Sequence, residues 1–172
     1  VVLAQSVEQS DGTYKRVYPA GTLAAHVVGY ASEKFGTAGI ESSYNDTLKG
    51  QRNYASWTDV LNASTGNSAA GNDVKLTINS TIQKAAQDAL EGFSGACVVI
   101  DPKTGAVLAL ASSPTYNAAD IETLLQNSSN SSDSSALYNR ATQALYPPGS
   151  TFKIVTLTGA LENNVATESS VF

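Results

Sequence analysis

Residues 73–117 read DVKLTINSTIQKAAQDALEGFSGACVVIDPKTGAVLALASSPTYN, and the first half of this stretch changes its periodicity midway. Residues 74–78 alternate apolar and polar side chains at period two, which predicts a strand. Residues 80–83, Ser-Thr-Ile-Gln, fit a capping box and predict the start of a helix. The apolar residues that follow share one helical face as far as Gly92, where a glycine is typical of a helix end.

The second half of the stretch predicts an antiparallel β-hairpin. Residues 96–100 and 106–111 are apolar runs on either side of residues 101–105, whose Asp-Pro-Lys-Thr-Gly sequence is typical of a turn. Both runs are almost continuously apolar, so we expect helices to cover both faces of the hairpin. Cys97 lies in the first run and is expected to be a small buried residue rather than a reactive thiol.

The flanking sequence completes a prediction of an α+β fold. Residues 1–72 contain short apolar runs broken by glycines and predict a small α/β region. We therefore expect one unit at 1–72 and a second unit at 73–172. Within the second unit, residues 127–135 are serine-rich and predict a solvated loop, and residues 136–145 have a modest helical pattern. A further apolar helix is expected from residue 152 to about 163.

Composition excludes several classes of function. The chain has 172 residues, 42% hydrophobic and 15% charged, and a net charge of −5, which argues against a general nucleic-acid binder. One cysteine and one histidine exclude an intramolecular disulfide and a multi-cysteine or multi-histidine metal centre. No apolar run approaches the ~18 residues of a membrane span, and no signal peptide is visible. Because the sequence contains no methionine, we expect it to be a piece of a longer or processed protein.

The candidate chemistry lies at Ser150-Thr151-Phe152-Lys153. Pro147, Pro148 and Gly149 predict a turn that places Ser150 at the start of the following helix. There the helix dipole and the free backbone N–H groups favour a developing negative charge on the hydroxyl. Lys153 shares a face with Ser150, and a partly buried amine at this position would take the serine proton and create a nucleophile without histidine.

The S-x-x-K pattern alone carries little information. Twenty-one serines and seven lysines predict about one match by chance, and one is present. The alternative interpretation of the tetrapeptide is a capping serine followed by a solvated lysine. We expect His26 to be a packing or hydrogen-bonding residue rather than a catalyst, and Glu41 to lie at a helix start or on the surface. Arg16 and Arg140 are candidates for ion pairs whose partners the sequence does not name.

Longer stretches resemble the class B penicillin-binding proteins, which are serine D,D-transpeptidases. NRATQALYPPGSTFK at 139–153 resembles the family's nucleophile segment, and residues 73–90 and 95–117 resemble the beginning of its transpeptidase domain. RVYPAGTLAAHVVGY at 16–30 and GTAGIESSYNDTLKG at 36–50 are similar to its N-terminal non-catalytic region. The resemblance therefore implies a non-catalytic linker, pedestal or dimerisation-like region at 1–72 and an incomplete N-terminal part of the transpeptidase domain at 73–172.

The resemblance implies roles for two residues. Ser150 would be acylated, Lys153 would be its general base, and the backbone N–H of Ser150 would form half of the oxyanion hole. The substrates would be the D-alanyl-D-alanine ends of peptidoglycan stem peptides, and β-lactams would acylate the same serine. The resemblance implies no cofactor and no metal. It also implies a membrane glycan polymerase as partner and a location on the extracytoplasmic face of the bacterial membrane, with an N-terminal anchor absent from this chain.

One departure from the family limits the implied activity. The family also needs an S-x-N motif and a K-[ST]-G motif downstream of the serine, and the sequence contains neither there. Lys103-Thr104-Gly105 is a literal match, but it lies upstream and is interpreted as a turn. We therefore expect this stretch alone to be inactive.

Two other functions stay open. The chain could be a non-catalytic structural or self-association module, or, with less support from residues 14–50, a β-lactamase or β-lactam sensor. Without downstream strands the hairpin would present an open sheet edge, so we expect either self-association through that edge or disorder after about residue 112.

Overall fold

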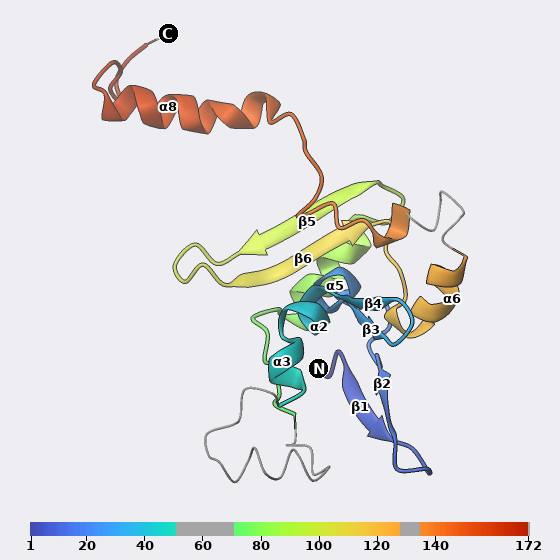
Figure 1. Ribbon diagram of the computed structural model, residues 1–172. Coiled ribbons are helices and arrows are strands. Elements are labelled where there is room, and N and C mark those ends of the chain that lie inside the picture. The colour runs from blue at the N-terminus through green and yellow to red at the C-terminus, as the bar shows by residue number, and fades with distance from the viewer. Residues whose placement is uncertain (51–70, 128–134, 172) are drawn as a thin grey trace.

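Short helices and three antiparallel two-stranded sheets form the described structure, a computed structural model that describes residues 1–50, 71–127 and 135–171 (Figure 1). This mixture confirms the predicted α+β class. In chain order the elements are β1 (Gln5–Glu8), β2 (Tyr14–Val17), α1 (Ala25–Val28), β3 (Tyr30–Ser32), β4 (Gly36–Ala38), α2 (Gly39–Ser43), α3 (Asn45–Leu48), α5 (Ser80–Ala89), β5 (Gly95–Ile100), β6 (Val107–Ser113), the 3-10 helix η1 (Ala118–Asp120), α6 (Ile121–Gln126), the 3-10 helix η2 (Gly149–Phe152) and α8 (Lys153–Glu162).

The predicted hairpin is confirmed as β5 and β6. The two strands pair antiparallel, with Cys97 opposite Ala111. In the connecting turn the Asp101 carboxylate accepts hydrogen bonds from the Lys103 N–H at 2.9 Å and the Thr104 hydroxyl at 2.7 Å. The K-T-G sequence at 103–105 is therefore part of a turn, as the sequence indicates.

One face of the hairpin is covered, and the other is not. Ala86 of α5 packs against Ala109 and Ala111 of β6 in a buried cluster, and the partly buried Cys97 lies beside it. On the opposite face Val98 and Ile100 remain exposed. The expectation that helices cover both faces is therefore wrong for the described residues, and Cys97 is less buried than expected.

The start of α5 differs from the prediction in two respects. Residues 74–78 form no regular strand, because the bonds that join this stretch to β6 are single contacts: the Thr77 hydroxyl donates to Val107 and the Asn79 N–H to Leu108. The N-cap is Asn79, one residue before the predicted box. Its side-chain oxygen accepts from the N–H groups of Thr81 and Ile82, which satisfies two amides of the first turn.

A buried glutamine completes the outer edge of β6. Gln83 is 1% exposed, and its amide donates to the Leu110 carbonyl at 2.9 Å and accepts from the Leu110 N–H at 2.8 Å. The side chain thus takes the place of a neighbouring strand. The N–H and carbonyl of Leu110 point away from β5, so Gln83 occupies the outer edge of β6. The edge of this sheet that stays open is therefore the outer edge of β5. Self-association through that edge stays a prediction.

Gln83→Ala is expected to destabilise the protein by about 2 kcal/mol, because it leaves both backbone groups of Leu110 without partners. Urea unfolding of the full-length protein measures the change. Gln126→Ala, at an exposed position of another helix, is the matched control and should change stability by less than about 0.5 kcal/mol. Equal effects of the two substitutions would contradict the strand-like role of Gln83.

The N-terminal region shares a hydrophobic core with a much later part of the chain. Tyr18 and Val28 pack in one buried cluster with Tyr116 and Ile121, and Ala136 and Leu137 contact the same cluster. The Tyr116 hydroxyl donates to the Ala25 carbonyl at 2.9 Å. The two sides of the predicted boundary at residue 72 are therefore packed together; the boundary itself lies beside residues 51–70, outside the described part.

A close crossing of two glycines sets the position of α2. Gly29 has φ +76° and Gly39 has φ +60°, and a Cβ on Gly29 would lie 1.9 Å from the Ala38 carbonyl oxygen. Only glycine fits this approach. The first turn of α2 then presents Glu41, which is buried and forms an ion pair with Arg16 at 2.8 Å. Glu41 thus lies at a helix start, as one expectation had it, but not on the surface.

The end of the described chain stands away from this body. Figure 1 shows α8 separated from the β5–β6 hairpin and reached by a single extended connection. Residues 135–137 are helical, but the chain then turns and does not continue as the helix expected to residue 145. Residues 113–127 and 135–171 do have defined structure, so the expectation of disorder after residue 112 is wrong for them. Most of the serine-rich loop, 128–134, lies outside the described residues.

Candidate active site

The predicted turn and helix place Ser150 as the sequence indicates. Gly149 adopts φ +55°, a conformation that glycine accepts without strain, directly after Pro147 and Pro148. Ser150 follows in η2, and the Lys153 N–H donates to the carbonyls of Ser150 and Thr151. One helical turn therefore connects Ser150 to Lys153, and α8 continues from there to Glu162 with Asn163 as its C-cap.

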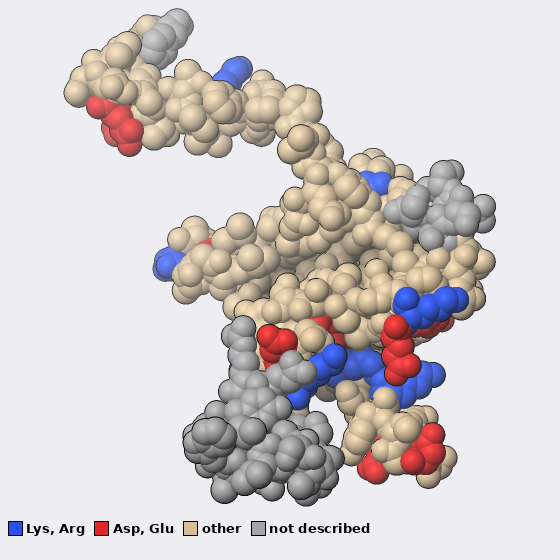
Figure 2. Space-filling view, in the orientation of Figure 1, with Lys and Arg blue, Asp and Glu red and all other residues tan. Residues whose placement is uncertain are grey.

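Ser150 and Lys153 lie on the same side of this turn. Residues three apart eclipse one another in a 3-10 helix, so the two side chains leave the backbone on the same side of the turn. Both side chains are exposed. Figure 2 shows α8 almost free of charged residues, and its sequence carries charge only at Lys153 and Glu162.

Two features of the pair differ from the expectation. Lys153 is exposed rather than partly buried. Within residues 135–171 no hydrogen bond joins the Ser150 hydroxyl to the Lys153 ammonium group; the bonds of this turn instead include the Thr151 hydroxyl donating to the Pro148 carbonyl. The structure therefore places Ser150 and Lys153 on one face of the turn, but their side chains are not hydrogen-bonded to each other.

The backbone N–H of Ser150 lies in the first turn of the helical segment. Amides there have no intrahelical acceptor and carry the positive end of the helix dipole. This N–H can therefore bind a negative oxygen beside the serine hydroxyl, which is the chemistry of one oxyanion-hole donor.

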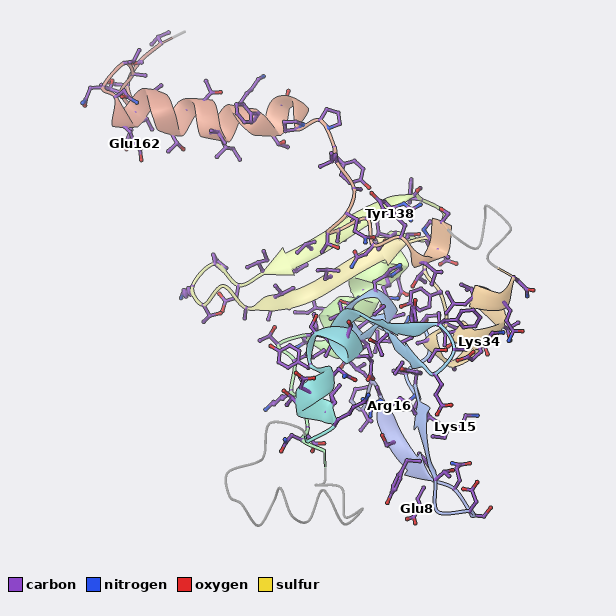
Figure 3. All side chains as sticks on the ribbon, in the orientation of Figure 1. Glu8, Lys15, Arg16, Lys34, Tyr138 and Glu162 are labelled. Atoms are coloured by element: carbon purple, nitrogen blue, oxygen red, sulfur yellow. The ribbon has the colours of Figure 1, made fainter. Side chains whose placement is uncertain are left out.

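Residues 135–143 anchor the connection that carries Ser150. Ser112 of β6, which is buried, donates from its hydroxyl to the Tyr138 carbonyl at 3.2 Å and accepts from the Arg140 N–H at 3.0 Å. Figure 3 shows Tyr138 where the connection toward α8 leaves the hairpin. After Tyr138 the chain soon loses contact with the body of the structure, since Leu145 is 98% exposed. The bonds that position the segment carrying Ser150 therefore end a few residues after Ser112's partners.

Among residues 1–50, 71–127 and 135–171, Arg140 has no carboxylate partner for the ion pair that the sequence suggested. Its guanidinium donates to the carbonyl of Ser135 at 2.9 Å and to its hydroxyl at 2.7 Å, and lies over the Tyr138 ring. Arg16 does form an ion pair, with Glu41.

His26 has the bonding role expected of it. Its Nε2 lies 2.8 Å from the Ala136 carbonyl oxygen, 110 residues away in sequence, and its ring meets Tyr116 edge to face. Sequence reasoning missed Ser112 and the partner of His26. The sequence signal for this region was the resemblance of residues 139–153 to the family's nucleophile segment. That resemblance does not indicate which residues elsewhere in the chain bind this segment.

Among the described residues no group of three or more histidine, cysteine, aspartate or glutamate side chains is placed to hold a metal ion. None of the helices in that part of the chain is long and apolar enough to cross a membrane.

Two family models match this chain in succession. Residues 1–74 match the penicillin binding protein A dimerisation domain, and residues 95–172 match the penicillin binding protein transpeptidase domain. Among curated proteins, the chain is 35% identical to the peptidoglycan D,D-transpeptidase MrdA of Acinetobacter baumannii and 34% identical to PbpA of Mycobacterium tuberculosis. The alignments cover 87% and 93% of this chain, and the chain spans 26% and 35% of these relatives.

Solved structures give the same result. The D,D-transpeptidase domain of a peptidoglycan glycosyltransferase from Eggerthella lenta is 57% identical, with a TM-score of 0.85 over 100% of this chain and 37% of that one. Penicillin-binding protein A from M. tuberculosis, as its penicillin G acyl-enzyme complex, is 33% identical, with a TM-score of 0.82 over 98% of this chain and 42% of that one.

Proposed function

This chain belongs to the penicillin-binding protein family, and we propose that it supplies the nucleophile, Ser150, and the general base, Lys153, of a serine D,D-transpeptidase. The observation that carries the proposal is the placement of both residues on one exposed face of a single helical turn. The match of residues 95–172 to a transpeptidase domain supports it.

The proposed reaction follows from these groups. Neutral Lys153 accepts the proton of the Ser150 hydroxyl, and the oxygen attacks the carbonyl carbon between the two D-alanines of a stem peptide. The backbone N–H of Ser150 stabilises the resulting oxyanion. The C–N bond then breaks, the leaving nitrogen takes the proton, and D-alanine departs. An amine of a neighbouring stem peptide attacks the ester, forms the cross-link and returns the serine.

The remaining parts of the proposal concern partners and place. β-Lactams would acylate Ser150 by opening their ring amide; because the nitrogen stays tethered, no fragment departs and the ester persists. A membrane glycan polymerase is the proposed protein partner, and the extracytoplasmic face of the bacterial membrane is the proposed location. The similarity to peptidoglycan D,D-transpeptidases supports both. Self-association is supported by the dimerisation-domain match over residues 1–74.

A fluorescent penicillin tests the proposed function on the full-length protein that carries this sequence. We expect one label per protein that survives denaturation and is lost slowly after free drug is removed. Rapid loss with release of hydrolysed penicillin would indicate a β-lactamase instead. No labelling would leave a non-catalytic module as the better account.

A further inference from the structure

We propose that His26 is a positioning residue for the acylation of Ser150, acting through residues 135–143. This inference rests on the proposed function. It assigns to the N-terminal region, which supplies neither Ser150 nor Lys153, a part in holding the segment that delivers the nucleophile.

His26 is fixed on both sides by the body of the structure. It belongs to α1, whose neighbours Ala25 and Val28 are buried in the N-terminal core. Its ring lies 5.1 Å from the Tyr116 ring at an interplanar angle of 79°. Because a carbonyl oxygen can only accept, the 2.8 Å contact with Ala136 requires a hydrogen on Nε2. The imidazole is therefore a rigid donor aimed at the backbone of residues 135–143.

Residues 135–143 bind to His26 at two points. The Asn139 side chain donates to the His26 carbonyl at 3.5 Å, while its oxygen accepts from the Ala141 N–H at 3.1 Å. The Asn139 N–H in turn donates to Gln143 at 2.9 Å. The contact of Ala136 thus belongs to a local network that shapes the whole turn before the chain leaves toward Ser150.

Loss of this contact should displace Ser150, because in the described part of the chain few other hydrogen bonds join residues 135–143 to the body of the structure. Ser112 is the second anchor, through Tyr138 and Arg140. Beyond residue 143 the chain is largely exposed up to Ser150. Catalysis is sensitive to displacements of about 1 Å in the supporting structure, so we expect loss of the His26 contact to change the acylation rate even while Ser112 still binds Tyr138 and Arg140.

Protonation of His26 should loosen the same contact. Burial lowers the pKa of His26 from its ordinary value, the nearby Arg140 charge lowers it further, and the bond to Ala136 opposes them. In the described part of the chain, the other titratable groups packed around α1 are Tyr116, whose ring touches His26, and Tyr18 and Tyr30 of the same core. Glu41 of the neighbouring helix α2 is paired with Arg16. Below about pH 6.5 the unfolded or released imidazole binds a proton more readily than the packed one. The contact is therefore stable above that pH and weakens as the pH falls toward the lowered pKa.

The test compares wild type, His26→Ala and His26→Gln in the full-length protein, by the rate of acylation with a fluorescent penicillin between pH 5 and 8. A glutamine amide can donate to the same carbonyl and does not titrate. At pH 7.5 we expect His26→Ala to be acylated about 10-fold more slowly and His26→Gln to retain most of the rate. Toward pH 5.5 the rate of wild type should fall relative to that of His26→Gln.

Hydrogen exchange provides the second readout. In His26→Ala the amides of Asn139, Arg140 and Ala141 should exchange faster, while that of Leu110, held by Gln83, should not change. Unchanged acylation and exchange in His26→Ala would overturn the inference, and so would coincident pH profiles of wild type and His26→Gln. If wild type is not acylated at all, the proposed function fails and the inference fails with it, whatever exchange shows.

Discussion

Ser150→Ala is expected to abolish covalent labelling by penicillin, because the substitution removes the only atom proposed to form the acyl bond. The effect should be a complete loss of stable label at every drug concentration, not a shift in affinity. Gel fluorescence after denaturation measures it. The backbone should be preserved, since the Ser150 side chain is exposed and η2 is closed by the Lys153 N–H bonding to main-chain carbonyls.

Ser169→Ala is the matched control for this substitution. Ser169 is also an exposed serine, located after α8, and among the described residues its hydroxyl forms a hydrogen bond only with that of Thr167. This variant should label like wild type. Residual label in Ser150→Ala would show that another residue reacts, and loss of label in Ser169→Ala would show that the assay reports folding instead.

Lys153→Gln is expected to slow acylation about 10²–10⁴-fold, which is the typical contribution of general acid–base catalysis. The amide keeps the length of the side chain but cannot accept a proton. The rate should be measured with excess drug in stopped-flow or quenched experiments. Labelling should still reach one per protein, because Ser150 remains.

Lys103→Gln separates a general base from a general loss of positive charge. Lys103 lies in the turn between β5 and β6, where its backbone N–H donates to the Asp101 carboxylate. The Lys103→Gln variant should be acylated by penicillin at the wild-type rate. A similar decrease in both lysine variants would contradict the role of Lys153 as base.

Local patterns predicted much of this structure correctly. The β5–β6 hairpin follows from two apolar runs around an Asp-Pro-Lys-Thr-Gly turn, and α8 follows from an apolar helical pattern that ends at Asn163. The turn at Ser150 follows from two prolines and a glycine that accepts φ +55°. In each case the determining residues are neighbours in sequence.

Contacts between distant residues could not be predicted in the same way. Gln83 looks like a solvated helix residue, yet it pairs with Leu110 because α5 packs along β6. His26 reaches Ala136 across 110 positions. Glu41 is buried and paired with Arg16, which lies on another element. The exposure of Lys153 likewise depends on what packs over the turn, which its own sequence does not specify.

Peptide mapping of the penicillin-treated full-length protein tests the central claim most directly. Trypsin should release residues 141–153, bounded by Arg140 and Lys153, and fragment ions should place one added penicillin mass on Ser150. A penicillin mass on Thr151, Thr142 or any residue outside this peptide would contradict the account.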